Sequence, residues 1–177
     1  MKIVIISSSL NKKSRSLIMA EYAKKIMDSI EVECEIIDLK KYSLPFCDGS
    51  DAYYQPEVKQ LNKHIKFSDA LLIATPIYNY NANAVIKNVI ELTGKAWTDK
   101  PVGFLCKAGG PKSYMSIIGL TNSLMLDFRC IIIPRFVYAE SRSFDSDKNI
   151  LTDSVIKKRI DELCQTLVKV ATAFKVA

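Results

Sequence analysis

Apolar segments alternate with segments of helical periodicity along the chain. Five segments are short, rich in Val, Ile and Leu and mostly apolar: residues 2–6, 32–38, 70–75, 102–106 and 130–137. This pattern is typical of strands buried on both faces. Between and after them, apolar residues recur at three- and four-residue spacing, which predicts helices that each bury one face. The predicted stripes lie within residues 17–27, 58–67, 85–92, 115–128 and 155–170.

This alternation predicts an α/β fold. Five strands separated by helices indicate a five-stranded parallel sheet with helices on both faces, a three-layer sandwich. Right-handed crossovers leave only a few doubly wound topologies, of which we expect the flavodoxin-like strand order 2-1-3-4-5. No repeat or linker divides the chain, so we expect a single domain over residues 1–177. Residues 40–55 and 138–152 are irregular, and loops of this length are often functional or lie at an interface.

Composition narrows the possible partners. Hydrophobic residues make up 49% and charged residues 25%, and no apolar run is long enough to span a bilayer. The net charge is +6, but the cations form no continuous stripe, so we expect a small anionic ligand and no nucleic acid. Five cysteines without ligand spacing and a single histidine indicate a reducing, cytoplasmic setting without a metal site. The first strand follows Met1 directly, so we expect no signal peptide.

The segment between the first strand and the first helix is rich in hydroxyl groups. This hydroxyl loop, residues 7–16, reads Ser-Ser-Ser-Leu-Asn-Lys-Lys-Ser-Arg-Ser. A helix that begins here directs its first N–H groups and its positive dipole end at the loop, an arrangement that favours a phosphate. The alternative is an ordinary helix cap by Ser14 or Ser16. Because a cap needs only one hydroxyl, the loop predicts a phosphate site.

Two further loops follow strands that end at the same edge of the expected sheet. The tyrosine loop, residues 75–81, reads Thr-Pro-Ile-Tyr-Asn-Tyr-Asn, and the glycine loop, residues 106–111, contains Gly109 and Gly110. Flat aromatic and amide groups suit a planar ligand, and paired glycines allow close backbone approach; both segments could also be plain turns. In this topology ligands bind between the first and third strands. A phosphate beside a planar ring describes a mononucleotide, and FMN is the natural candidate.

These segments resemble the NADPH-dependent FMN reductase family of flavodoxin-like flavoproteins, over most of the chain up to about residue 142. The family pattern Gly-Ser-x-Arg followed by serines corresponds to residues 8–16. Its Thr-Pro-Glu-Tyr-Asn segment, followed by a helix that begins near Pro-Gly and contains Lys-Asn, corresponds to residues 75–88. Its Lys-Pro strand and Gly-Gly loop correspond to residues 100–110. Five positions differ: Ser8 stands for Gly, Asn11 for Arg, Ile77 for Glu, and Asn83-Ala84 for Pro-Gly.

The resemblance implies roles for individual residues. The phosphate of FMN would be held by residues of the hydroxyl loop: Ser9, Asn11, Ser14, Arg15 and Ser16. The isoalloxazine ring would be lined by residues of the other two loops: Pro76, Ile77, Tyr78, Asn79, Gly109 and Gly110. No side chain is implied as a catalytic proton shuttle, and no metal is implied. NADPH or NADH would donate a hydride to flavin N5, and the electrons would pass to a small acceptor, such as a flavin, quinone, azo compound or metal.

Alternatives come from other classes of protein. A flavodoxin-type FMN electron carrier would share the fold, although such carriers are commonly acidic and this chain is basic. A hydrolase would need a Gly-x-Ser-x-Gly elbow and a triad histidine, whereas His64 falls in the second predicted helix, where we expect a structural role. We also expect a homodimer or homotetramer, in which Tyr53, Tyr54 and Phe144 either reach a neighbouring flavin or pack on their own domain.

Overall fold

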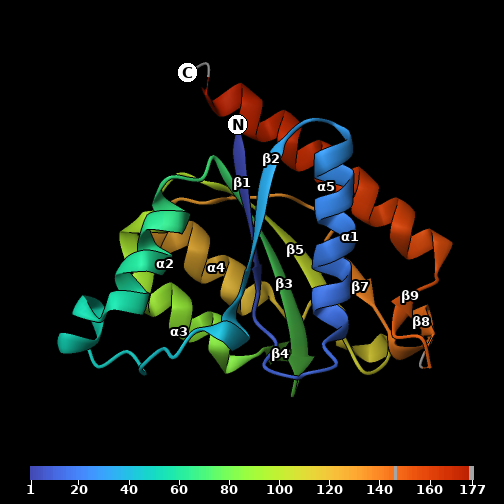
Figure 1. Ribbon diagram of the computed structural model, residues 1–177, viewed down its shortest axis with the longest axis horizontal. Coiled ribbons are helices and arrows are strands. Elements are labelled where there is room, and N and C mark those ends of the chain that lie inside the picture. The colour runs from blue at the N-terminus through green and yellow to red at the C-terminus, as the bar shows by residue number, and fades with distance from the viewer. Residues whose placement is uncertain (146, 176–177) are drawn as a thin grey trace.

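A parallel sheet lies between two layers of helices in the computed structural model, which describes residues 1–145 and 147–175 (Figure 1). Four strands lie side by side in the order β2 (Glu33–Asp38), β1 (Lys2–Ser7), β3 (Ala70–Tyr78) and β5 (Pro101–Lys107). The position beyond β5 is shared by two short strands, β6 (Ile131–Ile132) and β7 (Val137–Ala139), both parallel to β5. The predicted flavodoxin-like α/β fold and its strand order are confirmed.

The number of strands differs from the prediction. The sheet has seven strands rather than five, because the expected strand over residues 130–137 is interrupted and β4 (Asn81–Ala82) pairs antiparallel with β3. Pro134 has no N–H to donate to the ladder, and Arg135 adopts the left-handed region at φ 64°. A separate antiparallel pair, β8 (Phe144–Asp145) and β9 (Ile150–Leu151), lies in the expected irregular segment 138–152.

The helices divide between the two faces of the sheet. One face is covered by α1 (Arg15–Ser29) and α5 (Ser154–Lys175); the other is covered by α2 (Pro56–Lys66), α3 (Ala84–Thr93) and α4 (Ile118–Phe128) (Figure 1). Two of the helix starts have a clear local cause. Pro56 occupies the first position of α2, as predicted, and the Asp153 carboxylate accepts the N–H groups of Val155 and Ile156 at the start of α5.

Alternate residues of the central strands enter opposite cores. Ile3 and Ile5 pack toward α1 and α5, whereas Val4 and Ile6 pack toward α2 and α3, and all four are fully buried. The strands therefore read as continuous apolar runs. The predicted helical stripes are mostly buried, but four of their members are exposed or lie outside a helix: Phe67, Met115, Leu126 and Val155.

Short 3₁₀ turns connect these elements. Of these, η1 (Leu39–Lys41) overlaps the start of the expected irregular segment 40–55, and η2 (Asp51–Tyr54) lies within it. The others are η3 (Gly94–Trp97), η4 (Pro111–Ser113) and η5 (Ser141–Ser143). None of the described helices has the length and apolar character needed to cross a membrane. Ser146, Val176 and Ala177, which belong to the expected loop 138–152 and the expected domain 1–177, lie outside the described residues.

A network of ion pairs lies toward the end of the sheet where the parallel strands begin, which we call the amino end. His64 Nδ1 lies 2.8 Å from Glu35 Oε1, and Lys2 Nζ lies 2.9 Å from the same oxygen. Burial raises the pKa of Glu35, but the hydrogen bonds and charges of His64 and Lys2 outweigh it, so the pKa is lowered overall. His64 thus has the structural partner expected of a histidine in this helix.

Candidate functional site

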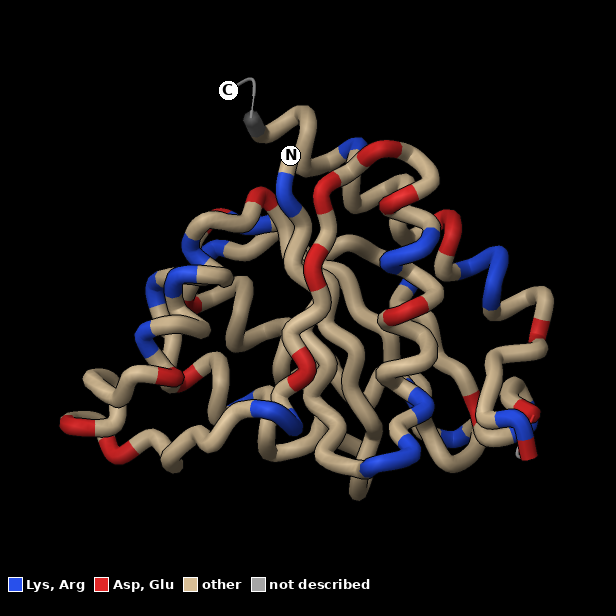
Figure 2. Tube along the Cα trace, viewed as in Figure 1, with Lys and Arg blue, Asp and Glu red and all other residues tan. Residues whose placement is uncertain are grey.

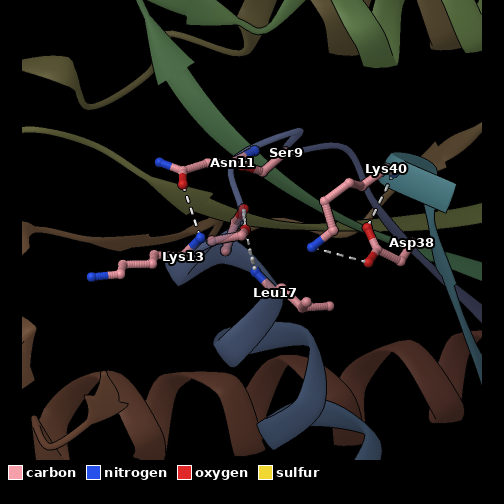
Figure 3. A network of polar contacts seen from close by, with 8 residues as sticks. Ser9, Asn11, Lys13, Leu17, Asp38 and Lys40 are labelled. Atoms are coloured by element: carbon pink, nitrogen blue, oxygen red, sulfur yellow. Dashed lines mark hydrogen bonds and ion pairs between the residues drawn. The ribbon is translucent and has the colours of Figure 1, made fainter. Parts of the chain in front are cut away.

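The hydroxyl loop connects the end of β1 to the start of α1 and is shaped by its own side chains. Ser14 caps α1, because its Oγ accepts the N–H of Leu17 at 3.0 Å. Asn11 Oδ1 accepts the N–H of Lys13 at 2.8 Å, and Ser9 Oγ accepts the N–H of Asn11 at 3.3 Å (Figure 3). The loop therefore has a defined conformation, and the first turn of α1 faces it with N–H groups that have no acceptor inside the helix.

More hydroxyl groups are buried in this loop than a helix cap requires. Five serines are nearly or fully inaccessible: Ser7, Ser8, Ser9, Ser14 and Ser16. Ser14 and Ser16 place their Oγ atoms 3.1 Å apart. Ser7 Oγ is buried without a hydrogen-bond partner among the described residues. By strand alternation Ser7 shares the face of Ile3 and Ile5, where α1 lies, so a buried donor remains beside the helix N-terminus. This donor set fits a phosphate group.

The hydroxyl loop and the tyrosine loop meet, as predicted, at the edge where β1, β3 and β5 end, which we call the carboxyl edge. Ser8 N–H donates to the carbonyl of Ala74 at 3.0 Å. The side chain of Asn83, which caps α3, donates to the Ser8 carbonyl at 2.7 Å and accepts from Ser8 Oγ at 2.8 Å. Two segments 75 residues apart are thus joined by direct hydrogen bonds.

The tyrosine loop forms a tight hairpin. Tyr78 of β3 pairs with Asn81 of β4, and the two residues between them, Asn79 and Tyr80, both adopt left-handed conformations at φ 50° and 59°. These values match a type I′ turn, which Asn favours at its first position. A tyrosine at positive φ is uncommon and strained. Pro76 and Ile77 are buried, whereas the side chains of Tyr78 and Tyr80 are exposed at the carboxyl edge.

The glycine loop leaves the sheet next to the tyrosine loop, since Lys107 is in register with Pro76. Neither Gly109 nor Gly110 has a positive φ, so neither is required for a left-handed turn. A Cβ atom on either glycine would meet no described atom within 4 Å, which leaves the space above both open to a ligand. Beyond the loop, the Ile117 N–H donates to the Tyr138 hydroxyl at 3.3 Å, which anchors the following segment to β7.

Positive charge gathers at the carboxyl edge (Figure 2). Lys107 Nζ donates to Ser141 Oγ at 3.2 Å, and Arg15 Nη1 reaches the Ser141 carbonyl at 3.5 Å and lies over the ring of Phe144. Burial lowers the pKa of Lys107, and the neighbouring charge of Arg15 lowers it further. An anionic ligand would relieve this repulsion. Phe144 is buried beneath Arg15 and so packs on its own domain.

The cysteines take no part in this edge as reactive thiols. Cys34, Cys106, Cys130 and Cys164 are buried, and none of the five cysteines forms a disulfide. Burial raises the pKa of Cys34 and Cys164 to about 12 and that of Cys130 to about 11, so these groups stay protonated and act as small apolar side chains. Among the described residues no cluster of His, Cys, Asp or Glu is arranged to hold a metal ion.

Sequence reasoning missed two residues of this edge. Asn83 stood out only as a departure from the family pattern, and Lys107 only as part of the glycine loop. Hydrogen bonds between distant segments leave no local pattern, so spacing alone could not reveal either role. All the predicted residues of the hydroxyl and tyrosine loops do lie at the carboxyl edge, together with the start of the glycine loop.

The fold and this edge define a flavodoxin-like protein. The chain belongs to the NADPH-dependent FMN reductase family, which it matches over residues 1–144. It is an NAD(P)H-dependent flavin oxidoreductase that uses FMN, and the alternative of a non-enzymatic electron carrier is not supported.

Relatives agree with this assignment, and a solved structure agrees with the fold. The chain is 30% identical to an NAD(P)H:quinone oxidoreductase of Solanum tuberosum, in an alignment that covers 98% of this chain and 94% of the relative. It is 28% identical to an NAD(P)H-dependent FAD/FMN reductase of Geobacillus thermodenitrificans over 147 residues, 82% of this chain and 79% of the relative. The solved structure of FerB, an NAD(P)H:acceptor oxidoreductase of Paracoccus denitrificans, has a TM-score of 0.79 at 20% identity and covers 97% of each chain. This last likeness supports the fold.

Proposed function

We propose that the carboxyl edge is the FMN site and that the chain uses it to reduce a quinone or azo compound with NADPH or NADH. When bound, FMN supplies the redox chemistry, because it accepts a hydride from the nicotinamide and passes electrons to the acceptor. The protein binds and orients the flavin. Its relatives include enzymes named for quinone and for azo substrates, which supports this choice of acceptors. Free flavins and metal ions are further candidate acceptors.

The hydroxyl loop holds the phosphate in this proposal. The binding residues are Ser9, Asn11, Ser14, Arg15 and Ser16, with the first N–H groups of α1. Ser7 supplies a buried hydroxyl that has no other partner among the described residues. Lys107 adds positive charge from the end of β5, beside Arg15. A phosphate would therefore be met by hydroxyl donors, a helix N-terminus and two cations.

The other two loops hold the ring. Pro76, Ile77, Tyr78 and Asn79 offer a wall of buried backbone and exposed planar side chains, and Gly109 and Gly110 leave open space on the opposite side. Backbone N–H groups directed at the flavin pyrimidine edge would stabilise the negative charge that reduction creates there. No side chain acts as a proton shuttle, and Tyr78 contributes ring contact.

The observation that supports the proposal most directly is the set of hydrogen bonds that Asn83 makes to Ser8 of the hydroxyl loop and to Thr75 of the tyrosine loop. The test is to titrate the purified protein with FMN and then, without oxygen, with NADPH or NADH. We expect one equivalent of FMN to bind and its visible absorption to bleach on adding nicotinamide. Failure to bind FMN at any concentration, with the protein folded by circular dichroism, would refute the proposal.

We further propose one FMN-binding domain over residues 1–177, which assembles as a homodimer or homotetramer in the cytoplasm. Both cores share the strands of one sheet, which supports one domain. Phe46 and Tyr54 are largely exposed in the segment 40–55 and are available for a subunit contact. Five free cysteines suit a reducing compartment. Light scattering at micromolar concentration tests the assembly.

A further inference from the structure

Asn83 makes more hydrogen bonds than its position requires. A residue that caps a helix needs to accept only one backbone N–H, which for α3 is that of Ile86 at 3.4 Å. The same Oδ1 atom also accepts from Ser8 Oγ at 2.8 Å and from Thr75 Oγ1 at 3.2 Å. Its Nδ2 donates to the Ser8 carbonyl at 2.7 Å, and the residue is only 5% exposed. One buried amide thus joins the end of β1, the end of β3 and the start of α3.

The chemistry of the amide explains why this side chain suits the position. Ser8 presents an acceptor, its carbonyl, and a donor, its hydroxyl, to the same neighbour. A single amide can hydrogen-bond to both groups, since it carries a donor and an acceptor at the same end. A carboxylate would place an oxygen against the Ser8 carbonyl, and a serine could still cap α3 but has no amide to donate.

We propose that Asn83 is a positioning residue that fixes the hydroxyl loop relative to the tyrosine loop and thereby makes FMN, rather than riboflavin, the preferred flavin. This inference rests on the proposed function, in which one loop binds the phosphate and the other binds the ring. A ligand held at both ends gains from each contact only if the two sites are already at the right separation. Riboflavin has no phosphate and contacts only one of them strongly, so its affinity depends little on that separation.

The chain offers a matched control on the same helix. Asn88 also bridges to a distant segment with two hydrogen bonds: Nδ2 donates to the Pro45 carbonyl and Oδ1 accepts from the Cys47 N–H, both at 2.9 Å. That segment belongs to none of the three loops at the carboxyl edge. Asn88→Ala therefore removes a comparable tertiary link without touching the connection between the two binding loops.

The experiment measures FMN and riboflavin dissociation constants for the wild type, Asn83→Ser, Asn83→Ala and Asn88→Ala by quenching of flavin fluorescence. Asn83→Ser retains a good helix cap and is expected to fold. We expect the preference for FMN over riboflavin to fall about tenfold in both Asn83 variants, the effect of losing one or two buried hydrogen bonds, and to stay unchanged in Asn88→Ala.

The outcomes separate this inference from the function on which it rests. A wild type that binds neither flavin would refute the proposed function. A wild type that prefers FMN, together with an Asn83→Ser variant that keeps the full preference, would refute the positioning role alone. An equal loss of preference in Asn88→Ala would also refute it, because the effect would then follow from general loosening of α3. A shift in thermal midpoint common to all variants cannot by itself change the ratio of the two affinities.

Discussion

Two half-buried lysines lie at opposite ends of β5, and they differ in what surrounds them. Lys100, before the first residue of the strand, donates to the carbonyls of Ser68 and Lys66 at 2.6 and 3.1 Å. Lys107, the last residue, donates to one hydroxyl and lies beside a second cation, Arg15. Burial lowers the pKa of both lysines. The charge of Lys100 is stabilised by two backbone carbonyls of the protein itself. The charge of Lys107 lies beside a second cation, so it favours the binding of an anion.

The same contrast extends to the two ends of the sheet. At the amino end Lys2, Glu35, His64 and Asp69 are joined by ion pairs and hydrogen bonds. The carboxyl edge instead contains a strained turn at Tyr80 and a buried hydroxyl without a described partner. The amino end pairs its polar groups within the fold, whereas in the proposed function the carboxyl edge keeps donors and charge for the FMN phosphate. Substitutions at the two ends should therefore affect different measurements.

The largest effect is expected from a negative charge in the hydroxyl loop. In Ser14→Asp the aspartate can still cap α1, so the protein should fold, with a loss of stability from burial of the carboxylate. A carboxylate a few ångströms from the phosphate should weaken FMN binding by about a hundredfold or more. Riboflavin affinity serves as the internal control, since it should change little. Ser14→Thr keeps both cap and hydroxyl and should bind FMN normally; equal FMN binding by Ser14→Asp would exclude a phosphate here.

A smaller effect distinguishes the two lysines of β5. Lys107→Met should weaken FMN binding by about tenfold, because a partly buried cation near the phosphate is lost, and should leave stability unchanged or slightly higher. Lys100→Met should do the reverse: it leaves two carbonyls without their donor and should cost about 1–3 kcal/mol of stability with FMN affinity intact. Titration of both variants with FMN compares their affinities, and chemical unfolding compares their stabilities. Identical behaviour of the two would show that the ends of β5 do not differ as described.

The smallest effect concerns the ion pairs at the amino end. The pKa of Glu35 is lower in the folded than in the unfolded chain, so its charged form stabilises the fold at pH values above the ordinary glutamate pKa of about 4.3. This contribution is lost as the pH falls through the lowered folded pKa. Glu35→Gln should therefore be about 0.5–1 kcal/mol less stable than wild type at neutral pH and equally stable in acid. A stability difference that is the same at pH 7 and in acid would contradict the ion-pair explanation.

Apolar periodicity predicted the fold well because burial acts on every residue of an element. Val4 and Ile6 need only be apolar to indicate a strand covered on both faces, and the topological rules left only a few strand orders, among them the one observed. The prediction of one continuous fifth strand was wrong, because Pro134 and Arg135 interrupt the apolar run and divide it into β6 and β7. The two binding loops were predicted to meet, but the role of Asn83 depends on a partner 75 residues away. Such a contact is specified by the folded structure and not by neighbouring residues.

The interruption at Pro134 and Arg135 has a consequence for how copies of the chain meet. A continuous outer strand offers a ladder of backbone groups on which another chain can add a strand and aggregate. Here one border of the sheet is divided into two short pieces, β6 and β7, with a left-handed residue between them. The opposite border, β2, carries the acidic side chains Glu33, Glu35 and Asp38. Strand-to-strand growth is thus discouraged by shape on one side and by charge on the other, which leaves helices and loops as the surfaces through which subunits can associate.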